Sequence, residues 1–177
     1  MKTRFSAGLI ALACIQSGFA ATCEPITRSA DAYAKAERFA VNMTMVSKGE
    51  THRTEVMMAP EGMFIKGGDQ WIRSPVSVNR RNLLDSTKST FSDCRLMGRE
   101  TIDGVPTVVY LVTGKTEGQP PMNGKIWIGT ADDLPRRMEG KNQDAEITQA
   151  IRYDVEAPKT GVLGVPGLDQ LKGLFGR

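Results

Sequence analysis

The chain has 177 residues, which suits a single domain with its own apolar core. Its 23 Lys and Arg nearly balance its 20 Asp and Glu, and two of the cations, Lys2 and Arg4, lie in a segment that we expect to be removed. The remainder is close to neutral, so we expect no nucleic-acid partner.

Residues 1–20 have the pattern of a cleaved secretion signal. A positively charged start precedes an apolar stretch over residues 5–15, which is too short to span a bilayer. Small residues at Gly18 and Ala20 suit a signal peptidase, so we predict cleavage after Ala20. The style of the signal indicates a protein of the bacterial periplasm.

Two of the three cysteines, Cys23 and Cys94, remain after this cleavage. In an oxidising compartment such a pair favours a disulfide bond, and no Cys-x-x-Cys motif indicates a redox-active thiol. The third, Cys14, ends a weak lipoprotein-type sequence, Ala11-Leu12-Ala13-Cys14. Lipid attachment at Cys14, giving an outer-membrane lipoprotein, is the alternative to cleavage after Ala20.

The first part of the mature chain predicts a short helix followed by an antiparallel meander. Ser29 is a suitable N-cap for a helix over Ser29–Arg38, whose apolar face is thin. Beyond it, apolar and polar residues alternate with period two between short turns, as in strands with one apolar face. We expect four strands, over residues 39–46, 51–58, 63–65 and 70–73.

A second meander is predicted after one interrupting helix. The stretch from Asn79 to Thr90 lacks strand character and suggests a helix of at most three turns. Cys94 to Glu139 predicts three or four antiparallel strands separated by turn residues, and Ala145 to Val155 predicts the last strand. The domain therefore covers residues 21–157, and residues 158–177 form a Gly- and Pro-containing tail.

The centre of the second meander, Val105 to Val112, is apolar on both of its alternating faces. A strand of this kind is covered on both sides, by the core of its own sheet and by another element. So long a sheet with so few helices must curl or leave an apolar concave face. The fold class is mainly β with a few helices (α+β).

The sequence shows no arrangement of residues that would carry catalysis. His52 is the only histidine, and no His or Cys cluster supplies partners for it. No nucleophile motif or phosphate-binding glycine loop is present. Asp132-Asp133 fits a β-turn better than a cation site, and Arg136-Arg137 fits a solvated surface pair. We expect neither an enzyme nor a bound cofactor or metal.

Methionines recur in or beside the predicted strands, and methionine adapts to varied apolar shapes. They could fill the core or line an adaptable groove, and both interpretations remain open. The groove interpretation names eight apolar residues, whose inward orientation follows only from alternation: Met43, Met45, Val56, Met58, Trp71, Val109, Leu111 and Trp127.

The order of elements, from secretion signal to second meander, resembles the LolA/LolB-like superfamily of periplasmic lipoprotein carriers over about Ser29 to Val155. The motifs that carry the resemblance are Gly98-Arg99-Glu100, Asp103-Gly104-Val105, Val109-Tyr110, Ile126-Trp127-Ile128 and Leu134-Pro135-Arg136. The resemblance implies a curved antiparallel sheet that forms a half-open barrel, with helices across its concave face. In the carriers, the space between barrel and helices accepts the acyl chains of a lipoprotein.

These observations lead to two hypotheses of function. The first is a monomeric periplasmic carrier that shields a lipid or lipoprotein acyl chain in an apolar groove. The second is a non-enzymatic envelope interaction or stress-sensing protein on the same scaffold, which recognises a protein partner. No residue pattern in the sequence names the ligand or the partner.

Overall fold

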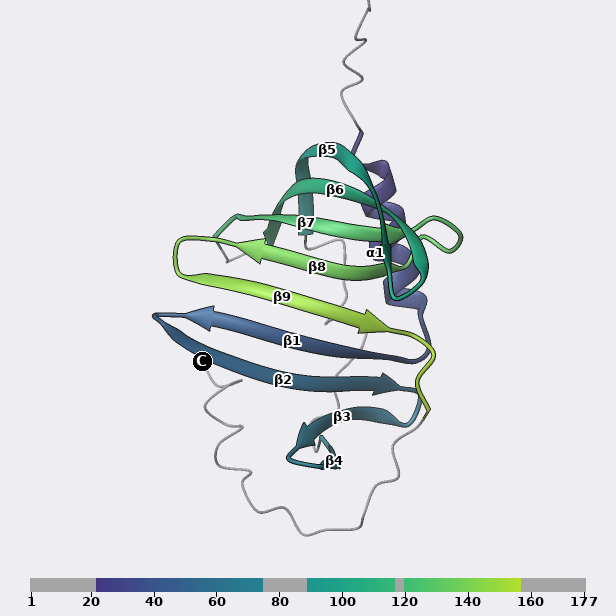
Figure 1. The fold of residues 1–177 in the computed structure, drawn as a ribbon, viewed down its shortest axis with the longest axis vertical. Coiled ribbons are helices and arrows are strands. Elements are labelled where there is room, and N and C mark those ends of the chain that lie inside the picture. The colour runs from purple at the N-terminus through teal and green to yellow at the C-terminus, as the bar shows by residue number, and fades with distance from the viewer. Residues whose placement is uncertain (1–21, 75–88, 117–119, 157–177) are drawn as a thin grey trace, which may run out of the picture.

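The computed structural model describes residues 22–74, 89–116 and 120–156, which form one helix and nine strands (Figure 1). The helix, α1, spans Glu24–Lys35. The strands are β1 (Phe39–Ser47), β2 (Glu50–Ala59), β3 (Gly62–Gly67), β4 (Gln70–Arg73), β5 (Ser89–Ile102), β6 (Val105–Thr116), β7 (Met122–Gly129), β8 (Pro135–Lys141) and β9 (Ala145–Arg152).

All nine strands belong to one antiparallel sheet with the order β4-β3-β2-β1-β9-β8-β7-β6-β5. The two meanders join where β1 pairs with β9, in a register that places Met43 opposite Gln149 and Met45 opposite Ile147. β4 and β5 are the two edges, so the sheet curves without closing, and α1 lies across one face of the second meander (Figure 1). The expected half-open, mainly β fold is confirmed.

Most predicted elements are present, with shifted ends. The helix begins at Glu24 and not at Ser29, because Pro25 sits in its first turn, where a missing N–H costs no hydrogen bond. Ser29 is therefore buried inside the helix and is not its N-cap. The last strand ends at Arg152, three residues before the predicted end at Val155. Val155 packs against the group formed by Ala40, Met57, Ala59 and Phe64.

Three predictions fall wholly or mostly outside the described residues. The secretion signal and the tail over residues 158–177 lie there. The helix predicted from Asn79 to Thr90 also lies there, except for Ser89 and Thr90, which begin β5 and are therefore strand. Among the described residues, no helix is long and apolar enough to cross a membrane.

α1 is attached to the sheet at several points along its length. The predicted disulfide between Cys23 and Cys94 is present and ties the residue before α1 to β5, with 5.3 Å between the two Cα atoms. Arg28 pairs with Asp133 in the turn between β7 and β8 at 3.3 Å. This ion pair is exposed and contributes little, so the covalent bond is the stronger attachment.

The two faces of the sheet differ, and we call the face toward α1 the inner face and the opposite one the outer face. On the inner face, Ile26 of α1 packs with Ile126 and Ile128 of β7. Further along, Tyr33 of α1 packs with a group around Phe39 of β1. Because strand side chains alternate between faces, these contacts assign a face to the other residues of each strand.

Candidate functional site

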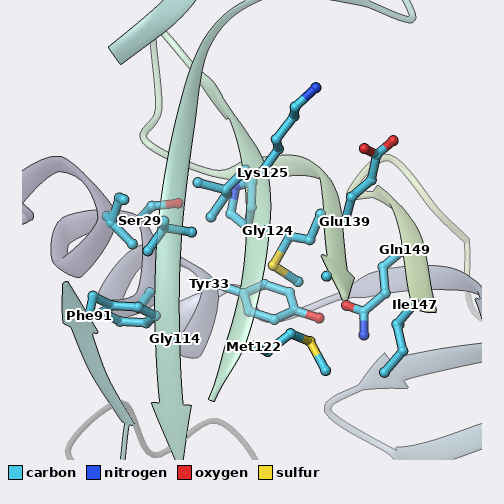
Figure 2. A pocket seen from close by; sticks show the side chains of 17 residues that line it. Ser29, Tyr33, Phe91, Gly114, Met122, Gly124, Lys125, Glu139, Ile147 and Gln149 are labelled. Atoms are coloured by element: carbon cyan, nitrogen blue, oxygen red, sulfur yellow. The ribbon is translucent and has the colours of Figure 1, made fainter. Parts of the chain in front are cut away.

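An apolar cavity of about 330 Å³ lies on the inner face, between α1 and the second meander. Side chains from the helix and from five strands line it, and Figure 2 shows how they converge. Its apolar lining comes from α1, β5, β6, β7, β8 and β9: Ile26, Ala30, Tyr33, Phe91, Val112, Met122, Ile126, Pro135, Met138 and Ile147.

Three glycines form part of the wall of this cavity. Gly114, Gly124 and Gly140 all line it, and Gly124 of β7 lies directly opposite Gly140 of β8. The side chain of Met122 occupies the space that a Cβ on Gly140 would need. A Cβ on Gly124 would overlap the carbonyl oxygen of Glu139, so β7 and β8 approach each other closely there. At Gly114, by contrast, a Cβ would meet its nearest atoms at an ordinary 3.9 Å.

The polar groups at the cavity are few. Gln149 donates a hydrogen bond from Nε2 to Sδ of Met43 at 3.7 Å, which joins the cavity wall on β9 to β1. Ser29 is fully buried where α1 meets the sheet, and its hydroxyl has no hydrogen-bond partner among the described residues. Lys125 and Glu139 border the cavity, but their charged ends point away from it (Figure 2). The interior of the cavity is thus suited to an apolar ligand.

Four of the eight predicted groove residues share the inner face with the cavity, although none of the eight lines it. Met43 and Met45 lie opposite Gln149 and Ile147 of the cavity wall, so they extend the same apolar surface onto β1. Val56 and Met58 of β2 lie on the same face, because Val56 pairs with Val41 and Met58 pairs with Phe39. Both partners pack in the group around Tyr33. Their contact with a ligand stays a prediction.

The other four lie on the outer face. Val109 pairs with Trp127, and both alternate with residues that pack toward α1. Leu111 pairs with Lys125 on the same outer face. Trp71 packs with a separate outer-face group of Ala40, Met57, Ala59 and Phe64. These four residues thus lie on the face opposite the cavity, and a strand that is apolar on both faces gives no sign of which face meets the helix.

The outer-face residues around Trp127 form a closed packing unit and not a cavity. Trp127 is 4% exposed, and its Nε1 donates a hydrogen bond to Oε2 of Glu100 at 2.8 Å. The guanidinium of Arg137 lies 5.1 Å from the centre of the Trp127 ring. Thr107, almost fully buried, donates from its hydroxyl to the carbonyl of Glu100 at 2.9 Å. This unit explains why the central strand is apolar on both faces.

Sequence reasoning missed several cavity residues, including Phe91, Met138 and Ile147. Ile147 lies in the predicted last strand, but nothing in the sequence marked which face of that strand is the inner one. The glycines gave a usable signal, because a strand glycine often marks a close approach of neighbouring backbones. Gly140 follows the predicted block, which ends at Glu139, and the pairing of Gly124 with Gly140 across β7 and β8 is visible only in the register.

The described residues contain no group of three or more His, Cys, Asp or Glu that could hold a metal ion. His52, the one histidine of the chain, is exposed on β2 with Glu50 at 3.5 Å. It lies outside the lining of the cavity.

The fold is similar to several solved structures of low sequence identity. LprF from Mycobacterium bovis has a TM-score of 0.51 and 12% identity, over 77% of this chain and 95% of that chain. The lipoprotein LppX from Mycobacterium tuberculosis has a TM-score of 0.49 and 13% identity, over 77% and 97%. A LolA superfamily protein from Nitrosomonas europaea has a TM-score of 0.29 and 9% identity, over 76% and 94%.

No family model matches the sequence, and no curated protein does either. At 12% identity, the likeness to LprF shows the shared fold alone. The expected half-open, mainly β fold is thus shared with a solved structure.

Proposed function

We propose that this protein binds one slender apolar ligand, of the acyl-chain type, in the cavity beneath α1 and carries it outside the cytoplasm. The observation that supports this most is the cavity itself. It is lined by apolar side chains and by glycines, which bring no side chain to the wall, and it lies under the single described helix.

The chemistry of the lining favours a hydrocarbon chain. Each buried methylene contributes about 0.8 kcal/mol, so a chain of several methylenes binds well without polar recognition. The charged ends of Lys125 and Glu139 point away from the cavity, so a buried ion is not favoured there (Figure 2).

The volume supports a single chain. A cavity of about 330 Å³ is near the lower end of the roughly 300–1,000 Å³ that small-molecule sites span. The surface can extend past Gln149 toward the half-buried Met43 and Met45 on β1. Flexible methionines on this extension suit chains of different length and shape.

Two observations support a location outside the cytoplasm. The Cys23–Cys94 disulfide is of the kind that persists in oxidising compartments. The sequence of residues 1–20 has the pattern of a secretion signal. In the periplasm, a protein that covers an acyl chain would let that chain cross water between two membranes.

The attachment of α1 indicates how a ligand could enter. The disulfide fixes the start of the helix at Cys23, whereas the far end is held by packing, with the Tyr33 ring centre 4.6 Å from that of Phe39. Non-covalent packing can open and close again, so we expect the end near Tyr33 to move when the ligand enters.

A titration with a fluorescent fatty-acid analogue tests this function. Met138→Asp places a carboxylate on the inner face at the cavity, and Leu111→Asp places one on the outer face at a similarly half-buried position. We expect Met138→Asp to weaken binding at least about tenfold, because the charge must be desolvated beside the chain, and Leu111→Asp to bind like the unaltered protein.

Thermal unfolding of both variants controls for loss of the fold. Saturable binding that Leu111→Asp loses and Met138→Asp keeps would contradict the assignment to the inner face. An unaltered protein that binds no acyl chain at all would contradict the carrier function and favour recognition of a protein partner.

A further inference from the structure

The hydroxyl of Ser29 is a polar group that the apolar lining of the cavity leaves unsatisfied. Ser29 lies in the middle of α1, lines the cavity and is fully buried. Among the described residues, three buried side-chain polar atoms have no hydrogen-bond partner: Oγ of Ser29 and Nε of Arg136 and of Arg137. Each of the two guanidinium groups binds a carboxylate through another N–H and lies outside the lining, so of the three atoms only the Ser29 hydroxyl is at the cavity.

The backbone of α1 does not satisfy this hydroxyl. A serine or threonine inside a helix commonly donates its hydroxyl to the carbonyl four residues earlier. Thr27 does so in this helix, with 3.3 Å between its Oγ1 and the carbonyl oxygen of Cys23, whereas Ser29 makes no such bond. Alanine would suit this position better, since it has a higher helix propensity and leaves no polar atom unsatisfied. The hydroxyl therefore costs stability within the folded chain, and a ligand that accepts its proton would explain it.

Ser29 and Gln149 lie on opposite sides of the cavity (Figure 2). On the side of Ser29, the preceding turn of α1 packs Ile26 directly against β7, which leaves little room beyond it. On the other side, Gln149 pairs with Met43 of β1, where the apolar inner face continues. An acyl chain with its polar end at Ser29 would therefore extend toward Gln149 and the half-buried Met43.

A neutral carbonyl oxygen is the ligand group that fits this donor best. A plain hydrocarbon offers no acceptor. A carboxylate accepts hydrogen bonds, but its charge would be buried in a lining whose one cation, Lys125, points its ammonium group away (Figure 2). An ester or amide carbonyl is uncharged, so its burial costs less. The lining thus favours an acyl chain whose carboxyl group is esterified or amidated.

We propose that the Ser29 hydroxyl donates a hydrogen bond to the carbonyl oxygen of an esterified or amidated acyl chain in the cavity. This role rests on the proposed function and adds a polar specificity to it. Because Ser29 is fully buried, the bond forms when α1 moves to admit the ligand. The disulfide at Cys23 keeps the start of the helix at β5 during this movement.

Competition between two closely matched probes tests this role. Methyl dodecanoate carries an ester carbonyl, dodecyl methyl ether lacks only that oxygen, and each is used to displace the fluorescent fatty-acid analogue. In Ser29→Ala, the affinity for the ester should fall about tenfold and that for the ether less than about twofold. Thr27→Ala removes an exposed hydroxyl from the same helix and is the matched control, so it should bind both probes like the unaltered protein.

Infrared spectroscopy of the bound ester gives a readout that a merely structural role of Ser29 would not change. With its carbonyl carbon isotopically labelled, the ester should absorb at a lower frequency in the unaltered protein than in a hydrocarbon solvent, because a hydrogen bond weakens the C=O bond. In Ser29→Ala the frequency should match that in hydrocarbon. The midpoint of thermal unfolding without ligand should not fall in this variant, since the change removes an unsatisfied polar atom.

The proposal is overturned if the ester bound to the unaltered protein absorbs as it does in hydrocarbon, a result that requires no variant to fold. It is also overturned if Ser29→Ala weakens both probes equally or weakens neither. An unaltered protein that does not bind the fluorescent analogue contradicts the proposed function itself. Binding of the analogue with equal changes for ester and ether contradicts the role of Ser29 and leaves the proposed function standing.

Discussion

Both faces of strands β6 and β7 carry apolar residues, and the two faces differ in how those residues pack. On the outer face, Trp127 and Val109 are 4% and 3% exposed, and the indole N–H is satisfied by Glu100. On the inner face, Val112 and Met122 remain half-buried beside an open volume beneath α1. The outer face is closely packed around Trp127, whereas the inner face retains space and incompletely covered apolar surface around the cavity.

The difference shows that apolar content alone does not mark a binding surface. Closed packing with satisfied polar atoms indicates stability, whereas half-buried apolar walls around empty volume indicate a ligand. Changes on the outer face should therefore lower stability with little effect on binding. Changes on the inner face should affect binding more than stability.

The largest effect is expected for Trp127→Ala. It removes a buried aromatic ring together with its hydrogen bond to Glu100, so the free energy of unfolding should fall by about 3–5 kcal/mol. Denaturant unfolding measures this loss, and fatty-acid affinity at a temperature where the variant is folded should not change. Met138→Ala, on the inner face, should show the reverse: a smaller loss of stability and a weaker affinity.

Removal of the disulfide should have the next largest effect. The Cys23–Cys94 bond joins residues 71 positions apart, and the double change Cys23→Ala with Cys94→Ala should lower the free energy of unfolding by about 2–4 kcal/mol. It also frees the start of α1, so the off-rate of a bound fatty acid, measured by displacement, should rise. An unchanged off-rate would show that α1 does not control access to the cavity.

Two glycines of the cavity wall give a matched comparison. Gly124→Ala brings a Cβ onto the carbonyl oxygen of Glu139, so unfolding free energy should fall by about 1–3 kcal/mol. Gly114→Ala fits at ordinary contact distance and should leave stability nearly unchanged. Calorimetric binding of fatty acids of increasing length should show a shorter preferred chain for Gly114→Ala. Equal stability of the two variants would contradict the close approach of β7 and β8.

The smallest effect on stability is expected from the titration of Tyr153, which packs near Phe39 on the inner face. Its hydroxyl donates a hydrogen bond to the carbonyl of Pro135 at 2.9 Å. Burial raises the pKa of Tyr153 above its ordinary value of 10.0. Above pH 10 the unfolded chain loses this proton while the folded protein keeps it. The unfolded state then binds fewer protons, so stability falls as pH rises.

Tyr153→Phe removes this contribution. Between pH 10 and 11, the unaltered protein should lose up to about 1 kcal/mol more stability than the variant, because the other tyrosines are common to both. Urea unfolding at pH 8, 10 and 11 measures the difference. Parallel curves for the two proteins across this range would show that Tyr153 titrates as it does in water.

Local patterns predicted most of the fold, because period-two alternation and turn residues act over short distances. They placed β1 to β4 and identified the second meander. The predicted start of α1 was too late because Ser29 resembles an N-cap, whereas Pro25 marks the first turn of the helix. The pairing of Cys23 with Cys94 was predictable, since only two cysteines follow the expected cleavage site.

The cavity was harder to predict, because it depends on register and on which face meets α1. Residues far apart in sequence, such as Ile26, Phe91 and Ile147, form it together. Val109 and Trp127 are apolar for a different reason, the closed outer-face packing, and single-strand patterns cannot separate the two causes. The same argument from alternation named Met43 and Met45, which lie on the inner face, and Val109 and Trp127, which lie on the outer face.

Native mass spectrometry of protein purified gently from the periplasm tests the central claim most directly, when it is followed by measurement of the denatured mass. The account predicts an additional lipid-sized mass on the native protein that disappears on denaturation and is absent from Met138→Asp. The denatured mass also reports cleavage after Ala20 or a lipid on Cys14. A native mass that shows no ligand, and that stays unchanged after incubation with fatty acid or an acylated peptide, would contradict the account.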